Sequence, residues 1–256
     1  MVLGVSIGNT RIALGLGGEN IRYPSTVLEN KGKITQAIEQ FIKSNNMRQN
    51  DITGAICASV NPRLTPALEE AVAQICGIKP YMVHGEMPML LDLSRYDKKT
   101  IGSDRIAVCE AAVTRYPMPA VIFDFGTAIT INVINDKKTF LGGSILPGLK
   151  IGLDVLANNT AQLPAVSLTL PPPNTLLGLT TEDSIISGVT HCTGAMVDGM
   201  VQRIENQILG NNNNKTTVLF TGGDAEYVLP FCKRDAVHVP ELLMEGLFLL
   251  YSRMKG

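Results

Sequence analysis

One stretch of the chain combines an apolar strand pattern with a polar turn. Residues 121–132, V-I-F-D-F-G-T-A-I-T-I-N, lead from an apolar segment through Asp124 into a turn at Gly126 and Thr127, and a second apolar segment follows. Apolar runs on both sides of a glycine turn are typical of a β-hairpin. The pattern therefore predicts two strands joined by a tight turn, with an acidic side chain next to that turn.

The beginning of the chain carries a diverged copy of this pattern. Residues 2–16, V-L-G-V-S-I-G-N-T-R-I-A-L-G-L, place Gly8 at the position of Gly126 and Ser6 at the position of Asp124. Two such hairpins in one chain predict two similar half-domains that face each other and bring both turns to a shared cleft.

Both turns have the composition of an anion site. Glycine lets backbone N–H groups approach a phosphate, Thr or Asn adds a donor, and a nearby carboxylate can hold a counter-cation. The alternative is that each is an ordinary hairpin with a glycine turn. The occurrence of two matching turns favours a nucleotide site.

The remaining hydrophobic periodicity predicts strands and helices that alternate along the chain, as in an α/β protein. Expected strands are residues 2–5, 11–16, 20–24, 55–58, 81–83, 120–124, 128–134, 139–146 and 217–220. Expected helices are residues 31–44, 65–75, 105–115 and 240–254, one helix from Lys150 and a long one beginning near Thr181. We expect an N-terminal half-domain over residues 1–116 and a C-terminal one over residues 117–256, which lies in the usual size range of domains.

Composition excludes several classes of partner. The 256 residues are 45% hydrophobic and carry a net charge of −1 with acids and bases mixed, so no basic surface favours nucleic acid or anionic lipid. No apolar run is long enough to span a bilayer. The partner is expected to be a small molecule or another protein. Five scattered cysteines indicate reduced thiols and a cytoplasmic location. They are Cys57, Cys76, Cys109, Cys192 and Cys232.

A second candidate site is the tetrad G-S-D-R at the expected start of a helix. Gly102 allows close approach, Ser103 or Asp104 can cap the helix, and Arg105 follows directly. One interpretation is that Asp104 accepts the proton of an attacking hydroxyl while Arg105 orients the substrate. The other is a common helix cap followed by a surface arginine.

Two further glycine-rich segments are weaker signals. Residues 142–149, G-G-S-I-L-P-G-L, suit a rigid loop against a ligand or an ordinary strand-to-helix connection. Residues 221–224, T-G-G-D, follow an apolar strand and could line a base or ribose. The three histidines do not share a spacing typical of metal ligands.

Taken in order, these motifs resemble those of the type III pantothenate kinases. The matching segments are S-I-G-N-T-R, Y-x5-G-S-D-R, D-F-G-T-A, G-G-S-I-L-P-G-L with T-A-Q-L-P downstream, T-E-D-S-I-I-S-G and T-G-G-D-A. The family belongs to the acetate kinase, sugar kinase, Hsp70 and actin superfamily. The resemblance implies two ribonuclease H-like (actin-like ATPase) half-domains, each a mixed β-sheet flanked by helices. It also implies ATP-dependent phosphorylation of pantothenate, the first step of coenzyme A synthesis.

The resemblance also implies roles for individual residues. Asp104 would be the catalytic proton acceptor, Asp124 would bind a monovalent cation, potassium or ammonium, and Thr181 would touch pantothenate from the partner subunit of a homodimer whose site lies at the subunit interface. Pantothenate would be held by Tyr96, Gly102, Ser103, Asp104 and Arg105. ATP, with Mg²⁺, would be held by Ser6, Ile7, Gly8, Asn9, Thr10, Arg11, Ile12, Ala13 and Thr127.

Ser6 departs from the family pattern, which opens with D-x-G-N. A serine can donate a hydrogen bond to phosphate, but it has no charge with which to hold a divalent cation. The alternative function is therefore a catalytically weakened or inactive nucleotide-binding regulatory homologue. The intact Asp104 and Asp124 favour an active kinase. A related kinase acting on acetate or a sugar would not explain Y-x5-G-S-D-R together with the glycine-proline loop.

Overall fold

The computed structural model describes residues 1–9, 11–17, 26–27, 31–210 and 215–255. The chain divides into two compact units, each of them a mixed α/β structure. Unit 1 contains Met1–Arg115 and Glu241–Gly256, and unit 2 contains Tyr116–Pro240. The division after Arg115 is one residue before the expected boundary at residue 116, and the segment Glu241–Gly256 groups with the N-terminal part of the chain.

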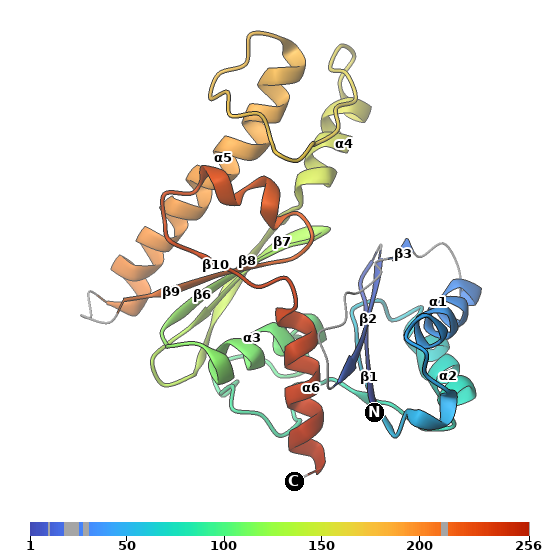
Figure 1. Ribbon diagram of the computed structural model, residues 1–256. Helices are drawn as coiled ribbons and strands as arrows, with labels where there is room; N and C mark the ends of the chain where they lie inside the picture. The colour runs from blue at the N-terminus through green and yellow to red at the C-terminus, as the bar shows by residue number, and fades with distance from the viewer. Residues whose placement is uncertain (10, 18–25, 28–30, 211–214, 256) are drawn as a thin grey trace. The chain divides into compact units, whose positions relative to one another are not determined.

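Unit 1 is built on one five-stranded sheet (Figure 1). Its strands are β1 (Val2–Ile7), β2 (Arg11–Gly17), β3 (Thr26–Val27), β4 (Gly54–Ser59) and β5 (Tyr81–Met82). Its helices are α1 (Lys31–Ser44), the 3-10 turn η1 (Gln49–Asp51), α2 (Thr65–Cys76), α3 (Ser103–Arg115) and α6 (Leu242–Lys255). The strand order is β3-β2-β1-β4-β5, with antiparallel pairs β1–β2 and β2–β3 and parallel pairs β1–β4 and β4–β5.

Alternation along β1 gives the sheet one strongly apolar face. Leu3, Val5 and Ile7 share this face, and each is at most 1% exposed. They form a core with apolar side chains from α1 and α2, among them Phe41 and Val72. Burial of aliphatic side chains of this kind stabilises a fold by about 1.5–3 kcal/mol each, which makes this core the main support of the unit.

The opposite face of the same sheet is covered by α6, and glycines make this possible. A Cβ at Gly4 would lie 2.5 Å from the sulfur of Met244, and a Cβ at Gly54 would lie 1.8 Å from the hydroxyl of Tyr251. On its other side, α6 approaches α3 so closely that a Cβ at Gly246 would lie 1.8 Å from the carbonyl oxygen of Ala107. These close approaches explain why the last helix belongs to unit 1.

Unit 2 repeats this plan with a second five-stranded sheet. Its strands are β6 (Ala120–Phe125), β7 (Ala128–Ile134), β8 (Phe140–Pro147), β9 (Thr217–Thr221) and β10 (Val237–His238). Its helices are α4 (Leu149–Asn159), α5 (Thr181–Ile204), the π turn η2 (Glu205–Leu209) and the 3-10 turns η3 (Ala225–Tyr227) and η4 (Leu229–Phe231).

The two sheets have the same topology. In unit 2 the order β8-β7-β6-β9-β10 corresponds to β3-β2-β1-β4-β5, with antiparallel pairs β6–β7 and β7–β8 and parallel pairs β6–β9 and β9–β10. The predicted internal repeat and the fold class, two ribonuclease H-like halves with mixed sheets flanked by helices, are confirmed.

An aromatic cluster forms the core of unit 2. Phe123, Phe125 and Phe220 are each 0% exposed, and the rings of Phe125 and Phe220 meet edge to face with centroids 4.9 Å apart. Val197 and Val201 of α5 pack against the same cluster. Such pairs add about 0.5–1.5 kcal/mol to the burial of the rings, so the face of β6 that carries the phenylalanines is fixed as the interior.

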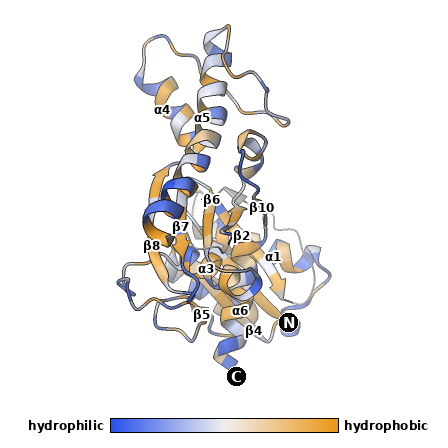
Figure 2. Ribbon diagram, turned by 90° about the vertical axis from the view of Figure 1, so that its left-hand side faces the viewer, coloured by the Kyte–Doolittle hydropathy of each residue, from blue (hydrophilic) through white to orange (hydrophobic). Residues whose placement is uncertain are grey.

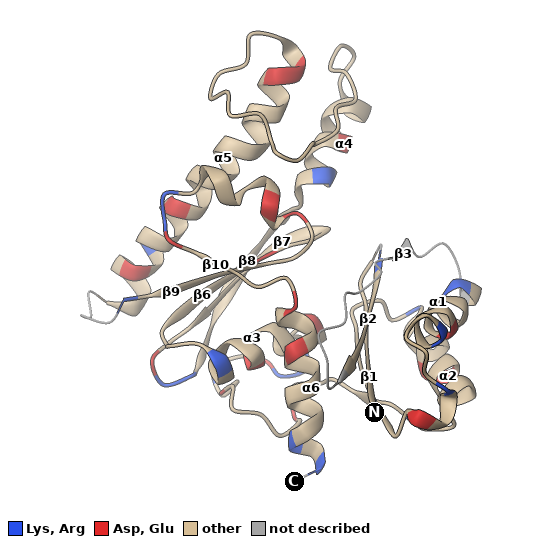
Figure 3. Cartoon of the chain, in the orientation of Figure 1, with Lys and Arg blue, Asp and Glu red and all other residues tan. Residues whose placement is uncertain are grey.

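The distribution of apolar and charged residues over the fold agrees with the composition. Hydrophobic residues concentrate in the strands (Figure 2), and basic and acidic residues are interspersed along the chain (Figure 3). In the part of the chain that the structure describes, no helix has the length and hydropathy needed to cross a membrane.

The element boundaries expected from periodicity agree with the structure in most places. The helix over residues 31–44 matches α1 at both ends. Helix α3 begins two residues earlier than expected, and α5 has 24 residues before it continues as the π turn. The short strand β10 was not predicted, and the strand expected over residues 20–24 lies outside the described residues.

Substitution of Gly246 by Ala should destabilise the protein, because the new methyl group would collide with backbone of α3. We expect the free energy of unfolding in urea to fall by about 1–3 kcal/mol, the usual cost of overpacking. The matched control is Gly199→Ala on α5, where a Cβ meets nothing within 4 Å. That change should be neutral or stabilising by about 0.5–1 kcal/mol. Equal effects of the two substitutions would contradict the close approach of α3 and α6.

Candidate active site

In unit 1, the turn after β1 lies at the edge of the sheet where two parallel strands end. The carbonyl oxygen of Ile7 accepts a hydrogen bond from the Val60 amide at 3.1 Å, which ties the end of β1 to the residue after β4. Ser6 is 7% exposed and lies between Ala13 and Ala58 on the adjacent strands. Because both neighbours are alanines, no bulky side chain on β2 or β4 lies directly beside the Ser6 hydroxyl.

The turn itself is closed by backbone. The Gly8 amide donates to the Arg11 carbonyl at 2.9 Å. The side chains of Ile7 and Ile12 are buried in the core, so only their backbone atoms are available to a ligand. A Cβ at Gly8 would make only an ordinary 3.5 Å contact, so the protein's own packing does not require glycine there. Asn9 is exposed, and Thr10 lies outside the described residues.

The start of α3 is attached to this same edge. The Ser103 hydroxyl donates to the Ser59 carbonyl at 3.0 Å and accepts from the Ser59 amide at 2.9 Å. Gly102 lies beside Val60, since a Cβ there would be 3.7 Å from a methyl carbon of that valine. The end of β1, the end of β4 and the first turn of α3 therefore meet in one place within unit 1.

Asp104 lies inside the first turn of α3. The expected role of Ser103 or Asp104 as helix cap was wrong, because the helix already includes both residues and the Ile106 amide bonds to the carbonyl of Gly102. The Asp104 carboxylate accepts the Arg105 amide at 2.7 Å. A Cβ at Gly102 would lie 2.6 Å from the same carboxylate oxygen, so glycine is required for this orientation of Asp104.

The environment of Asp104 favours its protonated form. Burial raises the pKa of this carboxyl above its usual value, and the opposing effects of the Arg105 amide and guanidinium are smaller. Perturbed pKa values of this kind are frequent at functional sites, which makes Asp104 the candidate acid–base group of unit 1.

Arg105 and Tyr96 are brought together next to Asp104. Arg105 is 8% exposed, and its guanidinium carbon lies 5.9 Å from the centroid of the Tyr96 ring. Tyr96 comes from the segment that precedes α3, so two separate parts of the sequence contribute to one cationic and aromatic surface. All five residues expected to hold pantothenate in unit 1 are thus neighbours.

In unit 2, Asp124 occupies the position on β6 that Ser6 occupies on β1. It lies opposite Thr130 of β7 and Thr221 of β9. Gly222 follows with φ +88°, and a Cβ there would lie 2.5 Å from both an Asp124 carboxylate oxygen and the Phe125 carbonyl. The T-G-G-D turn is therefore packed against the carboxylate of Asp124.

The Gly126-Thr127 turn is held by the glycine-proline loop. The Gly126 amide bonds to the Ala128 carbonyl at 3.1 Å, and the Gly148 amide bonds to the Thr127 carbonyl at 3.0 Å. A Cβ at Gly148 would lie 2.3 Å from the Gly126 carbonyl, so this glycine is required by packing. Strand pairing resumes at Ile129, so this turn is one residue shorter than its counterpart in unit 1.

An ion pair that the sequence did not predict supports the same region. The Lys150 ammonium lies 2.8 Å from a carboxylate oxygen of Asp224, which is 4% exposed. The Asp224 amide also bonds to the Phe125 carbonyl at 3.0 Å. The two charged residues are 74 positions apart, so no local pattern could have paired them. Likewise, nothing in the sequence marked Ser59 as the partner of Ser103.

Thr181 lies elsewhere in unit 2, at the exposed start of α5. The preceding residue, Thr180, caps this helix by accepting the Asp183 amide at 3.1 Å. Just before the helix, Leu176, Leu177 and Leu179 are 66%, 80% and 95% exposed. Thr181 therefore lies next to an exposed apolar segment.

No cluster of side chains in the described residues resembles a metal centre. Groups of three or more His, Cys, Asp or Glu side chains suited to a metal ion do not occur there. A cation at Asp124 would have to complete its shell with backbone oxygens, water or phosphate oxygens. Such oxygen ligands suit hard cations.

Comparison with known proteins agrees with this geometry. A family model described as type III pantothenate kinase matches residues 2–203. A type III pantothenate kinase from Exiguobacterium sp. (strain ATCC BAA-1283 / AT1b) is 31% identical over 259 residues, covering 99% of this chain and 99% of that protein.

Solved structures share the fold at lower identity. A conserved putative Baf family transcriptional activator from Campylobacter jejuni matches with a TM-score of 0.60 and 20% identity, over 99% of this chain and 98% of that one. The activator of 2-hydroxyisocaproyl-CoA dehydratase from Clostridium difficile, with bound ADPNP, matches with a TM-score of 0.56 and 13% identity, over 99% and 94%. The family model covers most of the chain, and the Exiguobacterium protein matches nearly its full length. The chain therefore belongs to the type III pantothenate kinase family.

Proposed function

We propose that the protein catalyses ATP-dependent phosphorylation of pantothenate to 4'-phosphopantothenate, the first step of coenzyme A biosynthesis. The observation that carries this proposal is the position of Asp104. Its carboxyl has a raised pKa and lies at the start of α3, whose first turn is attached to the sheet edge that bears the Ser6–Ala13 turn. Membership in the family supplies the substrates.

The reaction assigns one proton to Asp104. The substrate hydroxyl oxygen forms a bond to the γ-phosphorus of ATP, the bond from that phosphorus to the β-phosphate oxygen breaks, and ADP leaves. The hydroxyl proton passes to Asp104. Because phosphoryl transfer has a loose transition state, positioning and charge neutralisation matter more than base strength. A carboxylate with a moderately raised pKa is therefore sufficient.

Arg105 and Tyr96 are suited to the other end of pantothenate. The substrate carries a carboxylate, and arginine binds carboxylates through charge-assisted hydrogen bonds. The amides in the first turn of α3 offer further donors to an anion. Ser103 uses its hydroxyl proton on Ser59, so we assign it to positioning the helix and to a backbone contact with substrate.

The glycine turns are suited to the phosphates of ATP. Gly8 and Gly126 could each accept a Cβ without a protein clash, since the nearest contacts would be 3.5 Å and 3.6 Å. Glycine at both positions is explained by close approach of a ligand to the backbone. Side-chain donors to the phosphates would come from Ser6, Asn9, Arg11 and Thr127. Ala13 pairs with Ser6 on the adjacent strand. Only backbone atoms of Ile7 and Ile12 are available, because both side chains are buried.

The two proposed cations would be bound in different ways, Mg²⁺ through the phosphates of ATP and the monovalent cation through Asp124. Ser6 lacks the charge to hold Mg²⁺, so we propose that the divalent ion enters with ATP and neutralises its phosphate charge. Asp124 is a single carboxylate surrounded by glycine backbone, which fits potassium or ammonium better than an ion that needs several carboxylates.

The exposed segment before α5 supports a homodimer. Leu176, Leu177 and Leu179 lie beside Thr181, and exposed apolar residues of this kind mark association surfaces. We propose that a second copy of the chain covers them and that Thr181 reaches the partner's pantothenate site. A cytoplasmic location suits the reaction, and burial raises the pKa of the Cys57 and Cys109 thiols, which keeps both protonated.

Replacement of Asp104 by Asn should abolish product formation. Purified protein with ATP, magnesium, potassium and pantothenate is expected to form phosphopantothenate, and the variant should lose at least about 100-fold in kcat because the proton acceptor is gone. Asp136→Asn, in an exposed turn, is the matched control and should retain activity. Nucleotide binding by the wild type without any product would contradict the proposal and support a regulatory homologue.

The same substitution should change the pH dependence of stability. The folded-state pKa of Asp104 lies above the ordinary value of about 3.9. Its contribution to stability is therefore fully present below about pH 3.9 and is lost as pH rises through the folded pKa. The free energy of unfolding of Asp104→Asn, relative to the wild type, should rise across this range when measured by urea titration. A difference that is flat or falls with pH would contradict the buried, protonation-favouring environment.

Substitution of Gly8 by Ala should weaken ATP binding without loss of stability. The fold has room for the methyl group, but the methyl group would collide with a phosphate bound against the turn. We therefore expect the Kd for ATP to rise at least about tenfold, which is about 1.4 kcal/mol of binding free energy. Calorimetric titration measures the affinity, and thermal denaturation checks the fold. Gly199→Ala should leave the Kd for ATP unchanged and should not lower the thermal stability. An unaltered Kd in the Gly8 variant would show that ligand does not approach this backbone.

A further inference from the structure

Glu110 is a buried carboxylate that the proposed chemistry does not use. It lies on α3, is 0% exposed and is flanked by Cys109 and Ala111, which are also 0% exposed. Removal of an ionised carboxylate from water is costly unless the charge is paired and its oxygens are hydrogen-bonded. The position therefore requires a specific set of partners.

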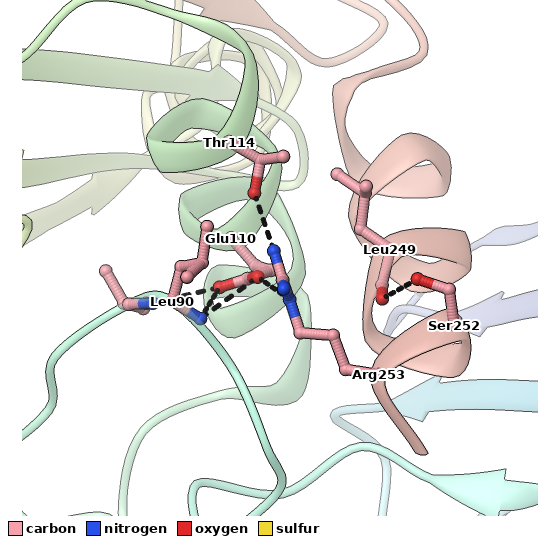
Figure 4. Close-up of polar contacts among 7 residues, drawn as sticks. Leu90, Glu110, Thr114, Leu249, Ser252 and Arg253 are labelled. Carbon is pink, nitrogen blue, oxygen red and sulfur yellow. Dashed lines mark hydrogen bonds and ion pairs between the residues drawn. The ribbon is translucent and has the colours of Figure 1, made fainter. Parts of the chain in front are cut away.

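Those partners come from two other segments (Figure 4). Glu110 Oε2 accepts the amides of Leu90 at 2.9 Å and Leu91 at 3.0 Å, and Oε1 accepts Nε of Arg253 at 2.6 Å. The Arg253 guanidinium also donates to the Thr114 hydroxyl at 3.4 Å. One carboxylate thus joins α3 to the loop that precedes it and to the last helix, α6.

The loop held by Glu110 is the one that carries Tyr96. Leu91 and Leu93 are each 3% exposed, and the Tyr96 amide bonds to the Leu93 carbonyl at 3.1 Å. The segment from Leu90 to Tyr96 is therefore held in place along its length, from the Glu110 carboxylate to the Tyr96 ring. Arg105 itself lies on the same helix as Glu110, about 7.5 Å away along the axis at 1.5 Å per residue.

We propose that Glu110 is a positioning residue for the pantothenate site. It fixes the loop to the helix so that Tyr96 and Arg105 keep their spacing of 5.9 Å. Arg253 supplies a positively charged partner for this buried side chain. The last turn of α6 thus supports substrate binding without touching substrate. This inference rests on the proposed function of the Tyr96–Arg105 surface.

The decisive variant is Glu110→Gln, which keeps the shape of the side chain and removes its charge. Its amide nitrogen cannot accept a hydrogen bond, so either a loop amide or Arg253 loses its partner. We expect KM for pantothenate to rise about tenfold, the equivalent of about 1.4 kcal/mol. KM for ATP and kcat should change less than about twofold, because the Ser6–Ala13 turn makes no contact with Glu110 and the start of α3, with Asp104, is held separately by the Ser103–Ser59 hydrogen bonds. The matched control, Glu70→Gln on the exposed surface of α2, should change neither KM.

A milder variant tests the same contact should Glu110→Gln fold poorly. Arg253→Lys retains the positive charge but loses the Nε–H donor of the planar guanidinium, so KM for pantothenate should rise by about two- to threefold. Parallel changes in both KM values and in kcat, in either variant, would indicate a general loss of structure and overturn the proposal.

Hydrogen exchange separates failure of this inference from failure of the proposed function. In the wild type, the amides of Leu90 and Leu91 should be protected, and in Glu110→Gln a peptide covering residues 87–100 should exchange at least about tenfold faster. A peptide from β1 should be unchanged. Unaltered exchange over residues 87–100 would overturn the inference even if pantothenate is the substrate. The other outcome is that Glu110→Gln accelerates exchange over residues 87–100 while the wild type does not phosphorylate pantothenate. That result would overturn the proposed function but not the anchoring of the loop by Glu110.

Discussion

The pair of hydrogen bonds between Ser103 and Ser59 determines where the chemistry of unit 1 can occur. A serine hydroxyl that both donates to and accepts from one residue's backbone fixes the start of α3 at the end of β4. Since β4 runs parallel to β1, that place is also where the turn after β1 begins. The proposed proton acceptor, Asp104, and the proposed phosphate-binding turn thus become neighbours through one short contact, and the tight packing of Gly102 then orients the Asp104 carboxylate.

The internal repeat is used for two different purposes. The strands, their order and their directions are the same in both units, yet the position before the turn is Ser6 in one and Asp124 in the other. The turn in unit 2 is also shorter by one residue and is held by the Gly148 loop. A common scaffold therefore presents a hydroxyl in one copy and a carboxylate in the other at the same position of the sheet.

Local patterns in the sequence were sufficient for most of the helices and strands but not for the contacts between them. The helix over residues 31–44 and the two glycine hairpins follow from periodicity and turn chemistry, and the G-S-D-R motif identified the candidate acid. The attachment of α6 to unit 1 depends on Gly4, Gly54 and Gly246, whose close contacts lie on distant segments. Pairing of Lys150 with Asp224 is equally non-local. Glu110 was a signal for such a partner. It is the single charged residue in the apolar stretch 106–113 of a predicted helix, and a charge in that place requires a buried partner.

The position of α6 has a consequence for the order in which the protein matures on the ribosome. The chain leaves unit 1 after Arg115 and returns to it at Glu241, so all of unit 2 is synthesised while one face of the first sheet still lacks its covering helix. Domains generally fold as they emerge from the N-terminal side. Here one face of the first sheet, with Gly4 and Gly54, stays uncovered until unit 2 has been synthesised. Residues on the far side of unit 2 therefore complete the part of the fold that is synthesised first.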